Sequence, residues 1–380
     1  MVARRKVPII LPSRANPKGF LAALILALAM PLSALAAPHT DVTIRGDAFY
    51  LNGQPTYAAH SWQGHSIEGL LFNARLVQGI WDDLNPDTVA NWAYPDTHRW
   101  DPDRNTSGFI AAMPDWRRHG LLAFTLNLQG GSPYGYSKAG QPWENSAFAP
   151  DGSLRPAYMA RLTRILDRAD SLGMVVIVGY FYVAQERRFI DEAAVLRASD
   201  NATRWLLSHN YRNVLVEIAN ESGTRFQQHA ILHPDHIAEL ITRTRAITLH
   251  GRRLLVGTSF GGGVLPPASV VTASDFILIH GNGVSDPGKS AQMVRDTRAI
   301  PGYTPKPILF NEDDHFAFDQ PLNNMTAALA EHASWGYFDY RMAGEGPADG
   351  FQSVPVDWTI DSPRKIAFFH LLAEITGSTP

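Results

Sequence analysis

Residues 214–221 read Val214-Leu215-Val216-Glu217-Ile218-Ala219-Asn220-Glu221. This apolar, β-branched run stops abruptly at a carboxylate, which is typical of a buried parallel strand whose last residues reach the rim of a sheet. A second run, Pro307-Ile308-Leu309-Phe310, ends in the same way at Asn311-Glu312. Together the two runs predict a parallel sheet that brings Glu221 and Glu312 to one edge.

Apolar runs and helical patterns alternate along the rest of the chain, with one helical or loop-rich stretch after the first run. The expected strands are 74–79, 121–129, 174–182, 214–221, 253–259, 276–280, 307–312 and 336–340, and the expected helices are 155–172, 191–208, 236–250, 325–334 and 363–376. Strands that alternate with helices form parallel βα units, so eight of them predict an α/β fold, a (β/α)8 TIM barrel. A short N-terminal β-hairpin at 42–55, with its turn at Asn52-Gly53, is expected to cover the barrel floor.

The first 36 residues predict a signal peptide. A basic segment precedes an apolar stretch at 20–35, and Ala34-Leu35-Ala36 forms a small-x-small cleavage signal. An uncleaved membrane anchor is the alternative, but Pro31 interrupts a stretch that is short for a span of about 20 apolar residues. We therefore expect a secreted or periplasmic protein with no stable membrane span after cleavage, in which residues 37–380 form one barrel.

The composition excludes several classes of protein. The chain has 33 Lys and Arg against 36 Asp and Glu, for a net charge of −3, and no basic block, so a nucleic-acid partner is not expected. Cysteine is absent, which excludes disulfides, thiolate nucleophiles and thiolate metal sites. Nine Trp and twelve Tyr offer flat apolar surfaces of the kind that stack on sugar rings.

In a (β/α)8 barrel the active site lies at the carboxyl ends of the strands. Acids, amides and aromatic side chains are expected at these ends, and such a set suits a neutral polyhydroxylated ligand. Two carboxylates that face one cleft are the minimum equipment for cleaving a glycosidic bond.

Asn220-Glu221 at the fourth strand and Glu312 at the seventh resemble the corresponding residues of the clan A retaining glycoside hydrolases, which include the family 5 cellulase-like enzymes. The resemblance implies that Glu221 is the acid/base, that Glu312 is the nucleophile and that Asn220 binds the sugar 2-hydroxyl. Glu217 also matches a frequent pattern in that clan, although a structural hydrogen-bonding role is the simpler interpretation.

The chain departs from the pattern of the clan at a few positions. Ser222-Gly223 follows the acid/base where the clan often has proline. Arg75 matches the arginine expected near the nucleophile, and either Trp335 or Tyr340 is the counterpart of the tryptophan on the eighth strand. The full set of expected substrate-binding residues is Asn220, His280, Asn282, Gln129, Asn127, Tyr182, Asp82, Arg75, Tyr340 and Trp335. No cofactor or metal is expected.

The implied mechanism needs different pKa values for two similar acids. Glu312 must be ionised to attack the anomeric carbon, and Glu221 must hold a proton for the leaving oxygen. The charge on Glu312 is expected to favour the protonated form of Glu221.

Three other interpretations stay open. Each glutamate could be a structural carboxylate paired with a basic residue, and the barrel could bind carbohydrate without catalysis. A metal-dependent hydrolase could use the cluster of Glu312, Asp313 and His315 with His280, although successive residues on a strand point to opposite faces. Transglycosylation shares the covalent intermediate, and the sequence does not choose between it and hydrolysis. The sugar, the linkage, endo or exo action and the oligomeric state are also open.

Overall fold

The computed structural model describes residue 8 and residues 40–136, 140–223 and 227–380. The chain divides into two units, residues 1–36 and 37–380, and the fold described below is that of the second unit. The expected signal peptide lies outside the described residues apart from residue 8. No helix in the described part of the chain is long and apolar enough to cross a bilayer.

Parallel strands form the centre of the second unit. Six of them hydrogen-bond in the order β10-β9-β8-β7-β6-β13, and β11 pairs with β12. Their bounds are β6 (Asn73–Arg75), β7 (Ala123–Asn127), β8 (Val175–Phe181), β9 (Val214–Ala219), β10 (Leu255–Gly257), β11 (Ile277–His280), β12 (Ile308–Glu312) and β13 (Gly336–Tyr337). Each lies within or at the edge of a strand expected from the sequence.

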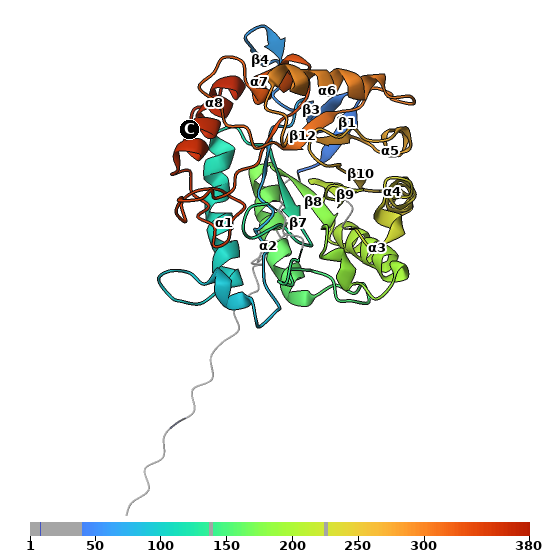
Figure 1. Cartoon of the computed structure of the whole chain (residues 1–380), viewed down its shortest axis with the longest axis vertical. Helices are drawn as coiled ribbons and strands as arrows, with labels where there is room; N and C mark the ends of the chain where they lie inside the picture. The colour runs from blue at the N-terminus through green and yellow to red at the C-terminus, as the bar shows by residue number, and fades with distance from the viewer. Residues whose placement is uncertain (1–7, 9–39, 137–139, 224–226) are drawn as a thin grey trace, which may run out of the picture. The chain divides into compact units, whose positions relative to one another are not determined.

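Backbone hydrogen bonds join the two parallel groups into a ring. The Phe310 amide donates to the Ser334 carbonyl at 2.9 Å, and the Asp313 amide donates to Gly336, so β12 lies beside β13. The Asp275 amide donates to the Val256 carbonyl at 2.9 Å, which places the start of β11 beside β10. The ring order is therefore β6 to β13, and the expected (β/α)8 barrel is confirmed (Figure 1).

Helices surround the strands in Figure 1. Their bounds are α1 (Pro102–Arg118), α2 (Pro156–Leu172), α3 (Glu192–Ser208), α4 (Ile237–Ala246), α5 (Ala268–Ala273), α6 (Pro287–Ala299), α7 (Asn324–Ala330) and α8 (Pro363–Thr376), with 3-10 turns η1 (Val89–Trp92), η2 (Glu186–Arg188) and η3 (Ala230–Leu232). All five expected helices are present, and α5 and α6 are additional. The stretch after the first strand, for which the sequence indicated either a helix or loops, contains α1. This helix begins with Asp101 as N-cap and Pro102 at its first position.

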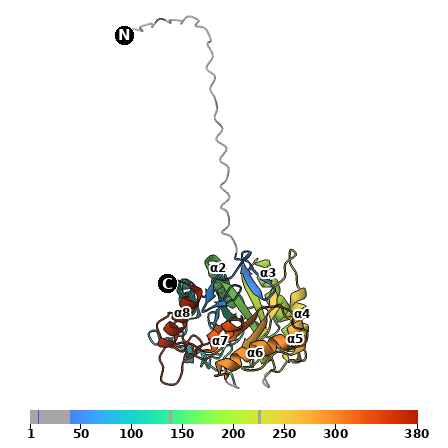
Figure 2. The same cartoon turned by 90° about the horizontal axis from the view of Figure 1, so that it is seen from above.

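The N-terminal strands, drawn in blue in Figure 2, lie at one end of the barrel and cover its floor. The segment is a three-stranded antiparallel sheet of β1 (Val42–Arg45), β2 (Ala48–Leu51) and β3 (Gln54–Pro55), and a separate small hairpin pairs β4 (Ser61–Trp62) with β5 (His65–Ser66). The expected turn at Asn52-Gly53 is present, but a first turn at Gly46-Asp47 adds a strand to the expected hairpin. Buried apolar residues at the amino ends of the barrel strands pack with this sheet: Val42, Phe49, Leu122, Val175, Leu215, Phe276 and Leu309 belong to one cluster.

Candidate active site

Glu221 lies at a sharp turn two residues beyond β9. Its backbone has φ +51°, in the left-handed region that non-glycine residues rarely adopt. The Glu221 amide donates to Ser259 Oγ at 3.0 Å, and the Ser222 amide donates to the Ser259 carbonyl at 2.8 Å. Such a conformation costs about 1–3 kcal/mol and persists where the surrounding structure enforces it, often at functional sites. The turn keeps Glu221 at the carboxyl rim of the barrel.

Glu312 is the last residue of β12, and its side chain is 7% exposed. Its Oε2 lies 2.6 Å from Arg75 Nε, and its Oε1 accepts a hydrogen bond of 2.7 Å from Asn282 Nδ2. Charge-assisted contacts of this kind fix both the position and the ionisation of a carboxylate. Arg75 thus lies beside Glu312, where the resemblance leads us to expect an arginine.

Arg75, the last residue of β6, connects three parts of the site. Besides Glu312, its Nη2 donates to Asn220 Oδ1 at 2.6 Å, and its Nη1 lies 3.8 Å from Glu217 Oε2. Burial disfavours the charged guanidinium, but the surrounding carboxylates outweigh it and raise the pKa of Arg75. Glu217 is fully buried and accepts a hydrogen bond from Asn311 Nδ2 at 3.2 Å, so it supports Arg75 from within the barrel.

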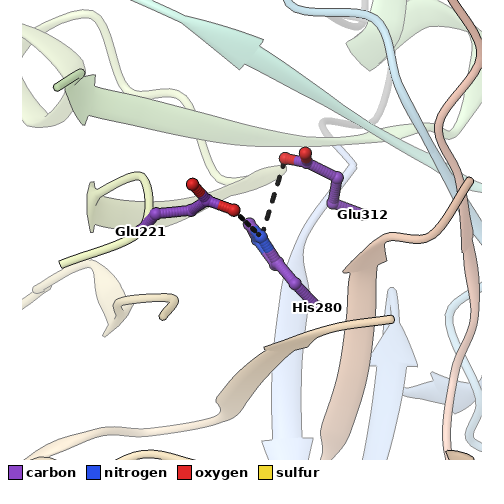
Figure 3. Close-up of side chains that lie close together, drawn as sticks. All are labelled: Glu221, His280 and Glu312. Carbon is purple, nitrogen blue, oxygen red and sulfur yellow. Dashed lines mark hydrogen bonds and ion pairs between the residues drawn. The ribbon is translucent and has the colours of Figure 1, made fainter. Parts of the chain in front are cut away.

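His280 lies between the two rim glutamates (Figure 3). Its Nδ1 is 3.2 Å from Glu221 Oε1 and 3.7 Å from Glu312 Oε2, and the ring is fully buried at the end of β11. One oxygen of each carboxylate and the imidazole nitrogen all lie within 4.8 Å of one another. Carboxyl groups about 5–5.5 Å apart characterise retaining glycosidases, whereas inverting enzymes separate them by about 6.5–9.5 Å.

The ionisation of the three groups is coupled through His280. Burial of Glu312 raises its pKa, although Arg75 and His280 oppose this effect. Burial alone would also raise the pKa of Glu221, but the hydrogen bond and charge of His280 outweigh it and lower that pKa. Burial would lower the pKa of His280, and the charge of Glu312 with the contact to Glu221 instead raises it. The free site therefore favours a cationic imidazole, rather than the protonated Glu221 expected from the charge of Glu312 alone.

The glutamates open into a pocket of about 140 Å³. The residues that line it are Arg75, Gly135, Tyr136, Tyr182, Asn220, Glu221, Glu312, Phe338 and Gln352. A larger groove of about 640 Å³ lies between α1 and residues 355–359, but its lining contains neither glutamate. Of these two hollows in the described part of the chain, the small pocket is the one whose walls carry the paired carboxylates.

Most of the expected polar site residues meet at this pocket. Arg75, Asn220, Tyr182 and the two glutamates line it, and His280 and Asn282 support the glutamates from behind. Tyr340 lies at the rim, where its ring contacts that of Tyr136 with centroids 4.6 Å apart.

The other four expected substrate-binding residues do not line this pocket: Gln129, Asn127, Asp82 and Trp335. Gln129 Oε1 accepts from the Tyr182 amide at 3.3 Å and its Nε2 donates to Ser146 Oγ, so it positions the end of β8. Asn127 is buried at the level of Glu217, because it pairs with Gly179, which in turn pairs with Glu217. Asp82 is occupied by Trp100 Nε1 and Arg161 Nη2.

Trp335 is the clearest correction. Its side chain is fully buried against Phe318 and Phe368, and its Nε1 donates to Asp313 Oδ2 at 2.9 Å. Tyr337 shares this outward orientation and stacks on Phe368. Side chains alternate along a strand, so the inward position belongs to Phe338, which lines the pocket.

Sequence reasoning missed four residues that line the pocket, namely Gly135, Tyr136, Phe338 and Gln352. The alternation of the last strand could have identified Phe338. Tyr136 lies in the long 132–156 loop, whose length is a signal of function. No pattern in the sequence marks Gln352.

The cluster required by the metal-dependent alternative is not assembled among the described residues. Glu312 groups with Glu221 and His280, whereas Asp313 groups with Asp314 and His315 on the other face of the strand. Asp313 already accepts hydrogen bonds from Trp335 Nε1, Asn324 Nδ2 and His315, which occupy both of its oxygens. In each of these two groups of three residues, the atoms that could bind a metal lie within 4.8 Å of one another. However, Asp313 already accepts the hydrogen bonds given above, and Glu312 is already paired with Arg75.

No protein-family model matches the chain. No curated protein matches it either. Solved structures do match it. A glycoside hydrolase family 5 enzyme from Prevotella bryantii is 12% identical in sequence, and the match covers 81% of this chain and 95% of that one with a TM-score of 0.52. A β-1,4-D-mannanase from Cryptopygus antarcticus (12% identity, 88% of this chain, 94% of that one, TM-score 0.51) and a broad-specificity endoglucanase from Bacteroides salanitronis (12% identity, 83% of this chain, 97% of that one, TM-score 0.51) match similarly.

These structures share the fold of this chain, which is a (β/α)8 barrel like that of the family 5 glycoside hydrolases. The chain spans nearly the whole length of these three proteins, but only 59% of a putative glycoside hydrolase from Bacteroides vulgatus.

Proposed function

We propose that the protein is a retaining glycoside hydrolase with Glu312 as nucleophile and Glu221 as acid/base. The observation that carries the proposal is the approach of one oxygen from each carboxylate to within 4.8 Å, at the carboxyl rim of the barrel and at the edge of a pocket. The match in fold to glycoside hydrolases that are named for glucan and mannan supports a carbohydrate substrate with these or related sugars.

In the first step Glu312 attacks the anomeric carbon and displaces the glycosidic oxygen, which takes the proton of Glu221. The product is a glycosyl ester of Glu312. Arg75, 2.6 Å from the attacking carboxylate, and Asn282 orient it and oppose the rise in its pKa that burial causes. Asn220, fixed by Arg75 Nη2, is positioned to hydrogen-bond the sugar beside the reacting carbon.

His280 carries, in the free enzyme, the proton that Glu221 later donates to the leaving group. A substrate that fills the pocket removes water from Glu221, and loss of water raises the pKa of a carboxyl group. The imidazole Nδ1, 3.2 Å away, can then pass its proton to Glu221. In the second step Glu221 accepts a proton from water, which attacks the anomeric carbon and breaks its bond to the Glu312 oxygen, so that Glu312 is released as a carboxylate.

We propose further that the enzyme acts outside the cytoplasmic membrane, in the periplasm or beyond the cell, with residues 37–380 as a single catalytic domain. The predicted signal peptide at residues 1–36 supports this location. Mass analysis of the exported protein would show cleavage after Ala36, and an intact N-terminus would overturn the location.

Two measurements test the chemistry. Proton NMR of the first product should show the anomeric configuration of the substrate, because two displacements restore it. An activated 2-deoxy-2-fluoro glycoside should add one glycosyl group to the protein, and peptide mapping should locate it on Glu312. First formation of the opposite anomer would indicate an inverting enzyme, and an adduct on Glu221 would reverse the two roles.

A further inference from the structure

The pocket beside the two glutamates is small. Its volume of about 140 Å³ is below the roughly 300–1,000 Å³ of sites that enclose drug-sized ligands. The space suits one sugar ring rather than a segment of polysaccharide. Glu312 is 7% exposed and Glu221 is 23% exposed, so the nucleophile position is deep and the acid/base lies nearer the opening.

An aromatic wall forms one side of the pocket. We define the wall as Gly135, Tyr136, Phe338 and Gln352, all of which line the pocket. The Tyr136 ring lies against Phe338 and Tyr340, with centroid distances of 5.8 Å and 4.6 Å and interplanar angles of 78° and 62°. The wall is thus built from two segments distant in sequence, the loop after β7 and the chain after β13.

Hydrogen bonds hold these two segments together. Ser132 O accepts from Gln78 Nε2 and from Gln352 Nε2, each at 3.2 Å, and the Val354 amide donates to Pro133 O at 2.9 Å. Ser132, Gln78 and Gln352 are all buried. The wall is therefore part of the packed structure and not a loose flap.

Gly135 brings the loop backbone into contact with the rim. Its φ is +107°, and a Cβ atom at this position would lie 2.8 Å from the Tyr340 ring. Only glycine combines this conformation with so close an approach. The loop backbone therefore packs directly against the Tyr340 ring at Gly135.

The position of the wall relative to Glu221 decides which end of a bound sugar chain would meet the wall. The ring order of the strands is β6 to β13, so β9, which carries Glu221, lies four places from β13, on the opposite side of the barrel. In the proposed reaction the leaving group lies against Glu221. The far side of the bound sugar, where a longer chain would continue toward its non-reducing end, then faces the wall.

We infer that the enzyme is exo-acting and removes single sugar residues from the non-reducing ends of its substrates. This inference rests on the proposed function, whose roles for Glu221 and Glu312 define the two sides of the pocket. It separates this protein from the structurally similar enzyme named as an endoglucanase.

The test compares aryl monosaccharides and aryl disaccharides that share one aglycone, over a panel of gluco- and manno-configured sugars in both anomeric forms. Glu312→Gln serves as the blank for each probe. The wild type should hydrolyse a monosaccharide probe and should release no intact disaccharide, a preference of about 100-fold or more, near the upper limit of discrimination by pocket fit. Mass spectrometry of the first product distinguishes intact disaccharide from stepwise removal of single sugars.

Tyr136→Ala should open the wall and lower this preference at least tenfold. Tyr134→Ala is the matched control, because Tyr134 lies in the same loop but packs on Trp92 and Trp143 and does not line the pocket. It should keep the wild-type preference.

Intact disaccharide or longer sugars as first products of a Glu312-dependent reaction would overturn the exo inference and leave the proposed function standing. An unchanged preference in Tyr136→Ala would refute the role of the wall. Equal rates for the wild type and Glu312→Gln on every probe would overturn the proposed function, and the exo inference with it.

Discussion

Arg75 Nε lies 2.6 Å from Glu312 Oε2, although the two residues come from the first and the seventh strand of the barrel. Closure of the ring makes these strands near neighbours, with only β13 between them. The guanidinium also contacts Asn220 and Glu217, so this buried cation connects β12 with β9 and the turn that follows it.

Removing this cation should be costly for stability. Arg75→Met leaves Glu312 and Glu217 as buried carboxylates without their positive partner, a change that costs about 3–5 kcal/mol. Urea unfolding measures the loss. The exposed pair of Arg118 and Asp115 is the control, because Arg118→Met should cost only about 0.2–1 kcal/mol. Equal losses for the two variants would contradict a central role for Arg75.

The two glutamates should respond differently to an external nucleophile. Glu221→Ala should reduce turnover of natural substrates by about 10²–10⁴-fold, and Glu312→Ala should reduce it at least as far, while circular dichroism shows that both variants keep the native fold. With an activated aryl glycoside, azide should rescue Glu221→Ala and give a product with the substrate's configuration. Azide should rescue Glu312→Ala with the opposite configuration. Near-wild-type activity in either variant would remove the role assigned to that residue.

The stability of the protein should depend on pH through His280. The raised pKa of His280 means that the folded protein holds this proton more tightly than the unfolded chain, because Glu312 and Glu221 face it while Arg75 opposes them only in part. This stabilisation is complete below the unfolded pKa of about 6.5 and is lost as pH rises through the folded value. The difference in melting temperature between the wild type and His280→Asn should therefore be larger at pH 6 than at pH 9. A difference that grows with pH would contradict the assignment.

Trp335 should act on stability and not on substrate binding. Trp335→Phe removes the donor to the buried Asp313 carboxylate and should cost about 1–3 kcal/mol, with KM unchanged. Trp62→Phe is the control, since its indole bond to Glu374 is exposed and its loss should cost about 0.5 kcal/mol. A several-fold rise in KM for Trp335→Phe at unchanged stability would contradict this expectation and show that Trp335 binds substrate.

Chelation should leave activity unchanged. Hydrogen-bond donors already occupy the Asp313 oxygens, and Arg75 occupies Glu312, so neither acidic triad needs a metal ion for its arrangement. Turnover is measured after incubation with EDTA and again after addition of zinc. A loss of activity that zinc restores would favour the metal-dependent hydrolase over the glycosidase.

The sequence predicted the elements well because the barrel strands are buried on both faces and therefore appear as continuous apolar runs. The strand ends then located Glu221, Glu312 and His280, since parallel strands present their carboxyl ends at one rim. The prediction for Trp335 was wrong because it lies at β13, the shortest of the barrel strands. A two-residue strand carries too little alternation to show which of its side chains point inward.

By itself, the sequence determined the barrel class, the pair of carboxylates and their delivery to a common rim, because apolar runs and their polar ends are local properties of the chain. Only the tertiary structure decided which groups meet there. It placed His280 between the glutamates, which reversed the expected pKa shift of Glu221, and it joined Tyr136 to Phe338 in one wall. Such contacts depend on the closure of the ring and on the path of long loops, and neither is encoded in the pattern of any single segment.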